Sequence, residues 1–236
     1  MSFYKDFVNF IAPVAKAYHR IEIEGIENVP PSGEGFIVVA NHSGWFGWDA
    51  IVIGALLSEH IVHWLAWSYE KEHPSWDLSV KALDGILCNK EKPFPYGDAV
   101  DMLKRGESVG IFPEGNSNPM TKWYRLRPFL PGFARLAAMS GATVLPCAVA
   151  GLEEASPILW AKEEIGEPIK TSIALPVVFP TKVHMCFGAP MRFGADPGDR
   201  DALLAAAAET QREILSLLKR YRPKAYAESA DGRTIS

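Results

Sequence analysis

Short, uninterrupted apolar runs are the feature of this sequence that most restricts its fold. Residues 36–40, 86–88, 108–112 and 142–150 carry few polar side chains, and stretches with helical spacing separate them. Strands that are apolar along their whole length are buried on both faces, as in a parallel sheet covered by helices. The alternation therefore predicts an α/β fold, with a mostly parallel central sheet flanked by helices.

One domain accounts for most of the chain. The 236 residues contain no linker that would divide two domains. We expect an N-terminal amphipathic segment at residues 1–17, a single domain at residues 18–222 and a polar tail at residues 223–236. Further strands are expected at residues 20–25 and 182–190, helices after Asp49 and at residues 95–106, 131–141 and 199–220, and irregular structure at residues 153–180.

The N-terminal segment has large apolar residues at helical spacing, and Pro13 is expected to bend or divide this helix. These apolar residues are Phe3, Phe7, Phe10, Ile11 and Val14. Such a helix either lies in a membrane interface or packs on the core, and the sequence favours neither. The apolar stretch at residues 136–152 is too short, and too interrupted by Gly141 and Pro146, to be read as a membrane span.

Charge and cysteine content exclude several function classes. A net charge of −4 argues against a nucleic-acid partner bound through bulk basic charge. Cys88, Cys147 and Cys186 lack the spacing of metal ligands and are expected to be buried, reduced thiols of a cytosolic protein. His60 and His63 have no carboxylate cluster beside them, so no metal site is expected.

Polar residues follow three of the predicted strands where each strand ends. Asn41-His42 follow residues 36–40, Pro113-Glu114-Gly115 follow residues 108–112, and Asn89-Lys90 follow residues 86–88. In a parallel sheet, ligands bind beyond the carboxyl ends of the strands. These residues form one site if the strands are neighbours.

His42 and Asp49 are candidates for a catalytic pair, because a histidine acts as a better general base when a carboxylate orients it. On an unbroken helix their spacing of seven positions would separate them by roughly 10 Å. Gly44 and Gly47 allow another geometry, in which the loop folds back and Asp49 points at the imidazole. The alternative is a solvated loop histidine and an aspartate that caps the next helix.

The motifs together resemble those of the glycerolipid acyltransferases, which include the lysophospholipid and glycerol-phosphate acyltransferases. In order they are FIVVANHSGWFGWDA, LDGILCNKEKP, GIFPEGNSN, PGFARLA, VLPCAVAG and KVHMCFGAPM, and they cover roughly residues 18–195. Asn-His after one buried strand and Phe-Pro-Glu-Gly after another form a specific combination. The longer His–Asp loop and the AGLEEASP sequence also resemble a branch likened to mono- and diacylglycerol acyltransferases.

The resemblance implies transfer of a fatty acyl group from a thioester, acyl-CoA or acyl carrier protein, to a lipid hydroxyl. His42 would be the general base and Asp49 the residue that orients it. The implied substrate-binding residues are Asn41, Lys90, Pro113, Glu114, Gly115, Lys122 and Arg125. No metal and no cofactor are implied, because the acyl donor is itself a substrate.

Two departures from the family pattern bear on the site. Six residues separate His42 from Asp49, where the family usually has four, and Asn116-Ser117-Asn118 replace the usual Thr-Arg-Ser. The resemblance therefore implies as acceptor either a lysophospholipid or a neutral or unusual lipid alcohol. A thioester hydrolase and a non-catalytic lipid-binding protein are the competing functions. We expect a protein peripheral to the cytoplasmic face of the cell membrane, with the aromatic loop around Trp45 resting on lipid.

Overall fold

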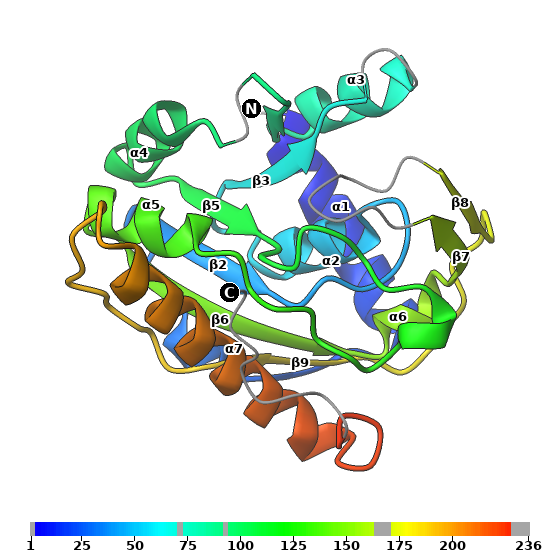
Figure 1. Cartoon of the computed structure of the whole chain (residues 1–236). Coiled ribbons are helices and arrows are strands. Elements are labelled where there is room, and N and C mark those ends of the chain that lie inside the picture. Colours follow the sequence, from blue (N-terminus) through cyan, green and yellow to red (C-terminus); the bar gives the residue numbers. More distant parts are fainter. Residues whose placement is uncertain (1–2, 70–72, 92–93, 163–170, 228–236) are drawn as a thin grey trace.

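A seven-stranded sheet forms the centre of the computed structural model, which describes residues 3–69, 73–91, 94–162 and 171–227 (Figure 1). The strand order is β1-β9-β6-β2-β5-β3-β4. The strands are β1 (Glu22–Glu24), β2 (Phe36–Ala40), β3 (Val62–Trp67), β4 (Ile86–Cys88), β5 (Ser108–Ile111), β6 (Thr143–Ala150) and β9 (His184–Phe187). Within this sheet only β6 and β9 pair antiparallel, so the mostly parallel sheet predicted from the apolar runs is confirmed.

Helices cover both faces of this sheet, as predicted. They are α1 (Phe3–Tyr18), α2 (Trp48–Leu56), α3 (Pro74–Ala82), α4 (Tyr96–Lys104), α5 (Gly132–Ser140), α6 (Leu152–Ala155) and α7 (Arg200–Tyr221), with short 3-10 turns at Ile26–Asn28 and Met120–Lys122. Ile37 and Val39 of β2 belong to the core formed with α4, α5 and α7. Phe36 and Val38 belong to the opposite core, formed with α2 and the end of α1. The central strand is therefore buried on both faces, which explains its continuous apolar sequence.

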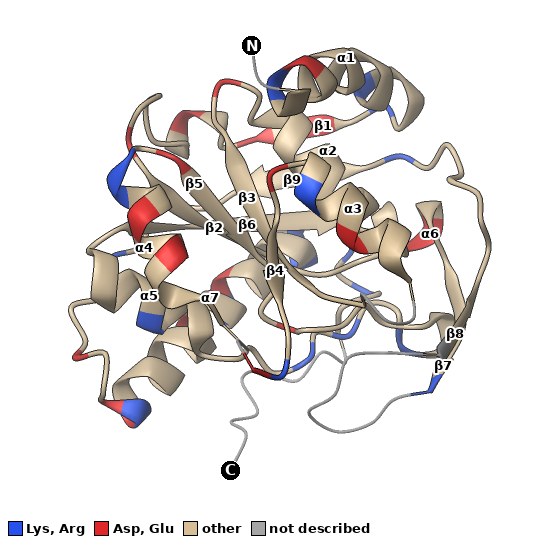
Figure 2. Ribbon diagram, turned by 90° about the horizontal axis from the view of Figure 1, so that it is seen from above, with Lys and Arg blue, Asp and Glu red and all other residues tan. Residues whose placement is uncertain are grey.

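Helix α1 is continuous through Pro13, and it both packs on the core and presents an apolar face outward. Tyr4 and Val8 are buried against α2, whereas Phe10 is 71% exposed and Val14 is 52% exposed. Its charged residues lie near its two ends, so the middle of the helix is uncharged (Figure 2). No helix in the described ranges is long and apolar enough to cross a membrane.

The prediction of irregular structure at residues 153–180 is wrong in its described parts. Helix α6 lies there, together with a separate antiparallel pair formed by β7 (Ile158–Lys162) and β8 (Thr171–Ala174). These two strands pair only with each other, and most of their described side chains are exposed. The short apolar run at residues 158–161 has its two central side chains exposed, unlike the runs in the strands of the main sheet.

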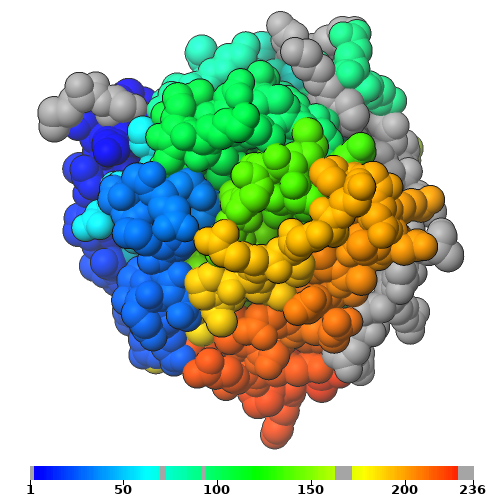
Figure 3. All heavy atoms as spheres, turned by 90° about the vertical axis from the view of Figure 1, so that its left-hand side faces the viewer, coloured from blue at the N-terminus to red at the C-terminus, as the bar shows by residue number. Residues whose placement is uncertain are grey.

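The two ends of the strands differ in what they present. The amino ends lie on the face shown in Figure 3, where residues 33–35, 103–106 and 140–143 surround an open hollow of about 300 Å³. The carboxyl ends lie on the opposite side (Figure 1), and the polar residues after β2 and β5 are found there. Sheets of this kind bind their ligands beyond the carboxyl ends.

Candidate active site

The loop at residues 41–47, between β2 and α2, folds back on itself. Gly44, Phe46 and Gly47 have left-handed backbone conformations, with φ angles of 86°, 67° and 65°. Glycine adopts this conformation freely, whereas in Phe46 it is a strained conformation that the surrounding structure must hold. The reversal brings the beginning of α2 beside the end of β2, so that His42 and Asp49 face each other.

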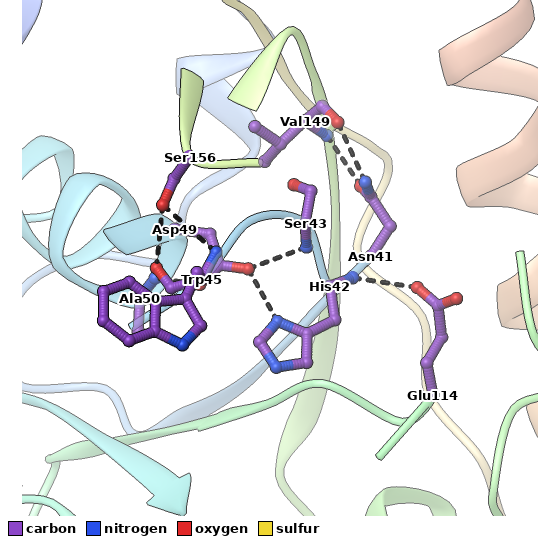
Figure 4. Close-up of polar contacts among 9 residues, drawn as sticks. All are labelled: Asn41, His42, Ser43, Trp45, Asp49, Ala50, Glu114, Val149 and Ser156. Carbon is purple, nitrogen blue, oxygen red and sulfur yellow. Dashed lines mark hydrogen bonds and ion pairs between the residues drawn. The ribbon is translucent and has the colours of Figure 1, made fainter. Parts of the chain in front are cut away.

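Asp49 is completely buried, and both of its carboxylate oxygens are used (Figure 4). Oδ2 lies 2.7 Å from Nδ1 of His42 and accepts a hydrogen bond from the Ser43 N–H at 2.8 Å, while Oδ1 accepts from the Ala50 N–H at 2.9 Å. The interpretation of Asp49 as a helix cap is wrong, because Gly47 holds the N-cap position and Asp49 lies in the first turn. The structure therefore has the folded-back loop and the His–Asp contact that its glycines allow.

The environment of His42 favours a basic imidazole, whose Nε2 has no hydrogen-bond partner within the described ranges. Burial lowers the pKa of His42, but the charge of Asp49 and the hydrogen bond to it raise the pKa, and the net pKa lies above the ordinary value for histidine. Because the carboxylate is an acceptor, Nδ1 carries the proton of the neutral ring and Nε2 has the lone pair. His42 also lines a cavity, so this arrangement suits it to accept a proton from a bound hydroxyl.

Two polar clamps fix the backbone on either side of His42. The Glu114 carboxylate accepts hydrogen bonds from the N–H groups of His42 and Arg127, each at 2.8 Å. The Asn41 side chain both donates to the Val149 carbonyl and accepts from the Val149 N–H, again at 2.8 Å. Burial raises the pKa of Glu114 to about 7, against the two backbone N–H groups, which lower it. Asn41 and Glu114 thus position the loop that carries the imidazole.

Two aromatic rings stack in succession on one face of the His42 imidazole. The imidazole stacks on Phe112 with the ring centroids 4.3 Å apart, and Phe112 stacks on Trp64 at 4.6 Å. Trp64 in turn lies over Gly110 of β5, where an added Cβ would come within 2.4 Å of its ring. Only glycine leaves room for the Trp64 ring at this position. Gly110 therefore determines how close Trp64 lies to β5, and through Phe112 it affects the position of the His42 ring.

We therefore expect Gly110→Ala to displace the stack. Overpacking of this kind costs about 1–3 kcal/mol, so the free energy of unfolding should fall by that amount. The imidazole resonances of His42 should shift as well, because its ring support moves. Thermal unfolding and NMR of the histidine side chains measure the two effects.

Gly97→Ala is the matched control, since an added Cβ at Gly97 in α4 meets nothing within 4 Å. It should leave the unfolding temperature unchanged or slightly higher, as alanine favours a helix more than glycine does. Wild-type stability in Gly110→Ala would contradict the supporting role of the stack.

A narrow cavity of about 20 Å³ opens beside His42. Its lining comes from the ends of β2 and β5, the segment after Met120–Lys122, the start of α6 and the turn after α7. The lining residues are Asn41, His42, Ser43, Glu114, Asn118, Trp123, Tyr124, Arg125, Leu126, Glu153 and Tyr226. The ends of the neighbouring strands β2 and β5 therefore meet at one site, as the sequence predicts.

The other predicted site residues take different positions. Arg125 lines the cavity and is exposed. Lys122 is exposed and is not part of the lining, and Gly115 is an exposed turn residue with a φ of 75°. Pro113 is buried, and its carbonyl accepts a hydrogen bond from the Leu130 N–H. Lys90 follows β4 at the edge of the sheet, two strands beyond β5, and is likewise outside the lining.

Sequence reasoning missed Glu153 and Tyr226. Both are buried and line the cavity, and the Tyr226 hydroxyl donates to the Glu153 carboxylate at 2.5 Å. The position of Glu153 directly after the run at residues 142–150 was an available signal, because that run is another strand whose carboxyl end faces the site. Tyr226 lies in the predicted polar tail, and no sequence pattern marks it.

The described ranges contain no group of three or more histidine, cysteine, aspartate or glutamate side chains that could hold a metal ion. His63 instead contacts the Asp84 carbonyl and Glu107. Cys88, Cys147 and Cys186 are free and buried, as expected for reduced thiols. Burial raises the pKa of Cys88 to about 12, so this thiol has little nucleophilic character.

Comparisons with known proteins support the acyltransferase family that the sequence motifs resemble. A sequence model of the acyltransferase family matches residues 20–150. The 1-acyl-sn-glycerol-3-phosphate acyltransferase of Bacillus subtilis (strain 168) is 28% identical over 172 residues, which are 70% of this chain and 82% of that protein. An uncharacterized protein of Mycobacterium leprae (strain TN) is 31% identical over 166 residues, or 61% of this chain and 40% of that protein. One of Mycobacterium tuberculosis (strain ATCC 25618 / H37Rv) is 29% identical over 199 residues, or 75% of this chain and 53% of that protein. The chain spans about half the length of these mycobacterial relatives.

The crystal structure of the 1-acyl-sn-glycerophosphate (LPA) acyltransferase, PlsC, from Thermotoga maritima has a similar fold. The TM-score is 0.61 at 21% sequence identity, and the match covers 90% of this chain and 79% of that chain. At this identity the likeness concerns the fold, and it confirms the predicted α/β architecture.

Proposed function

Since the chain belongs to the acyltransferase family, we propose that it transfers a fatty acyl group from an acyl thioester to the hydroxyl of a lysophospholipid or a related glycerolipid. The observation that carries this proposal is the 2.7 Å contact between His42 and the buried Asp49, beside a cavity at the carboxyl end of the sheet. The similarity to the Bacillus subtilis acyltransferase supports a glycerolipid acceptor.

In the proposed reaction His42 acts as a general base, and no covalent intermediate on the protein is needed. Nε2 takes the proton of the acceptor hydroxyl as its oxygen attacks the thioester carbonyl. The tetrahedral intermediate then collapses, the C–S bond breaks, and the thiolate leaves with the proton from the imidazolium. Asp49 stabilises that imidazolium and holds the ring in the required tautomer.

The remaining residues have supporting roles in this proposal. Asn41 and Glu114 hold the backbone of His42, as their hydrogen bonds suggest. Arg125 and Lys122, both exposed, would meet phosphate groups of the donor or acceptor at the rim of the cavity. Acyl-CoA and acyl carrier protein both supply the necessary thioester, so the reaction needs no cofactor beyond its two substrates.

The test is thiol release from palmitoyl-CoA by the purified protein, with lysophosphatidate, lysophosphatidylcholine, monoacylglycerol or no acceptor. Release that depends on an acceptor is expected. Equal release without acceptor would make the protein a thioester hydrolase instead. If palmitoyl-CoA fails, the same panel with an acyl carrier protein donor follows, and failure of both donors would contradict the proposal.

We further propose that the protein works at the cytoplasmic face of a membrane through an exposed apolar band. The band consists of Phe3, Phe10, Val14, Tyr18, Val177 and Phe179, which are between 42% and 71% exposed. The Tyr18 hydroxyl donates to the Val178 carbonyl, so the end of α1 and the segment after β8 lie together. A band of large apolar side chains on one face suits the interface between water and lipid.

We expect liposomes to recover the protein in flotation, and Phe10→Ser with Val14→Ser to lower its partition coefficient by about 10²-fold or more, because the two buried side chains together contribute about 3–6 kcal/mol. Met139→Ser is the control, since Met139 is 45% exposed on α5, which belongs to the other core. Flotation of the double variant at the wild-type level would contradict the assignment of the band.

A further inference from the structure

His19 is a completely buried histidine that the proposed mechanism does not use. It follows α1 directly, and α1 packs on α2 (Figure 1). The backbone of His19 is held on both sides, because its N–H donates to the Ala15 carbonyl and its carbonyl accepts from the Val183 N–H. Close packing and these two bonds leave the residue little freedom to move. His19 is therefore a fixed point for any group that its imidazole contacts.

The imidazole of His19 contacts Trp48, the first residue of α2. The indole N–H of Trp48 donates to Nε2 of His19 at 2.9 Å. An indole nitrogen only donates, so Nε2 must keep its lone pair and accept. Burial lowers the pKa of His19, which favours the neutral ring that this bond needs. The bond is therefore formed at neutral pH, and it joins the end of α1 to the beginning of α2.

The beginning of α2 lacks the usual side-chain cap. Its N-cap residue is Gly47, which has a left-handed backbone with a φ of 65° and no side chain to bond the first turn. Many helices begin at a serine, threonine, aspartate or asparagine whose side chain fixes the first N–H groups. In α2 the Trp48–His19 bond ties the first turn to another part of the fold instead.

Asp49 directly follows Trp48 in the same turn, so a displacement of Trp48 also displaces the carboxylate that contacts His42. A hydrogen bond weakens steeply as its length and angle depart from the ideal values. The charges that act on the His42 imidazole are those of Asp49, Glu114 and Arg127. Of these three, Asp49 alone lies on α2, whereas the other two follow β5. A movement at the beginning of α2 therefore reaches His42 through Asp49.

We propose that His19 positions the catalytic pair of the proposed reaction. By accepting the Trp48 indole N–H, His19 fixes the first turn of α2. That turn then holds Asp49 at hydrogen-bond distance from His42. His19 lies outside the lining of the cavity, so it acts through α2 and not on a substrate. The inference rests on the proposed acyl transfer, in which this pair is the general base and its orienting carboxylate.

The first test compares the kinetics of three variants of the full chain. His19→Leu cannot accept the indole N–H, so kcat for acceptor-dependent thiol release should fall by about 10- to 10²-fold at unchanged KM, as expected from a small misplacement in the site. His19→Gln keeps an acceptor and should recover most of the rate. Trp48→Phe should match His19→Leu, and the double variant should be no slower than either, because all lose the same bond. A wild-type kcat in His19→Leu, or additive losses in the double variant, would overturn the inference.

Titration of His42 by NMR separates positioning from a loss of stability. Asp49 raises the pKa of His42, so this pKa should fall in His19→Leu and return toward the wild-type value in His19→Gln. His60→Leu is the matched control, since His60 is also buried and lies just beyond the other end of α2, where it packs edge-on against Phe36. The control should lose stability but keep the wild-type kcat and the wild-type pKa of His42. An unchanged pKa in His19→Leu, or an equal fall in His60→Leu, would count against positioning.

The titration needs no catalysis, so the inference and the proposed function can fail separately. A His42 pKa that responds to His19, in a protein without transferase activity, would refute the proposed function but keep the link from His19 to the His42–Asp49 pair. An active wild type whose kcat and His42 pKa are both insensitive to His19→Leu would keep the proposed function and refute the inference.

Discussion

Replacement of His42 by alanine should reduce acyl transfer by about 10²- to 10⁴-fold, the usual contribution of a positioned general base. His42 lines the cavity, and its Nε2 has no hydrogen-bond partner among the residues that the structure describes, whereas Asp49 and Glu114 are both occupied by hydrogen bonds. Loss of the imidazole leaves the acceptor hydroxyl protonated at the moment of attack. Initial rates of acceptor-dependent thiol release measure the effect.

His184→Ala is the control for this experiment. The two histidine side chains have nearly the same exposure, 19% for His42 and 21% for His184, but His184 lies on β9 and pairs with Glu22. The control should lose some stability and retain the wild-type rate. A His42→Ala protein that is folded and still transfers acyl groups at more than a tenth of the wild-type rate would exclude the general-base role.

The fold was predictable wherever a strand is buried on both faces. The apolar runs at residues 36–40 and 142–150 mark central strands of the sheet, and burial on two sides forces such a sequence. Strands β7 and β8 were not predictable in this way, because they pair only with each other and leave side chains such as Trp160 exposed. Burial in the core therefore does not constrain the sequences of these two strands.

The site was predictable to the extent that strand ends define it. Asn41, His42 and Glu114 come together because β2 and β5 are neighbours. Lys90 also follows an apolar strand, but that strand is β4 at the edge of the sheet. The order of the strands within the sheet could not be predicted from the sequence. Tyr226 reaches the cavity only through the packing of α7, so its place depends on the whole tertiary structure.

Among substitutions that keep the shape of the site, Asp49→Asn should be the most damaging. The asparagine has nearly the same volume, but its amide group can no longer stabilise the imidazolium, and it can favour the wrong tautomer of His42 by donating to Nδ1. Activity should fall by about 10²- to 10⁴-fold. Asp77→Asn is the matched control, since Asp77 is also buried and accepts bonds from the Tyr69 N–H and the Ser68 hydroxyl, but it does not line the cavity.

The pH dependence of activity distinguishes an effect of Asp49 on the imidazole from a mere loss of stability. The charge and hydrogen bond of Asp49 raise the pKa of His42 against the opposing effect of burial. Transfer requires the neutral imidazole, so the wild-type rate should decline as the pH falls through that raised pKa. Asparagine removes the raising influence and leaves burial, which favours the neutral ring. The acidic limb of the residual activity should therefore move to lower pH in Asp49→Asn. A limb at the wild-type position would mean that Asp49 holds the loop without acting on the imidazole, and its contribution to the rate would then be structural.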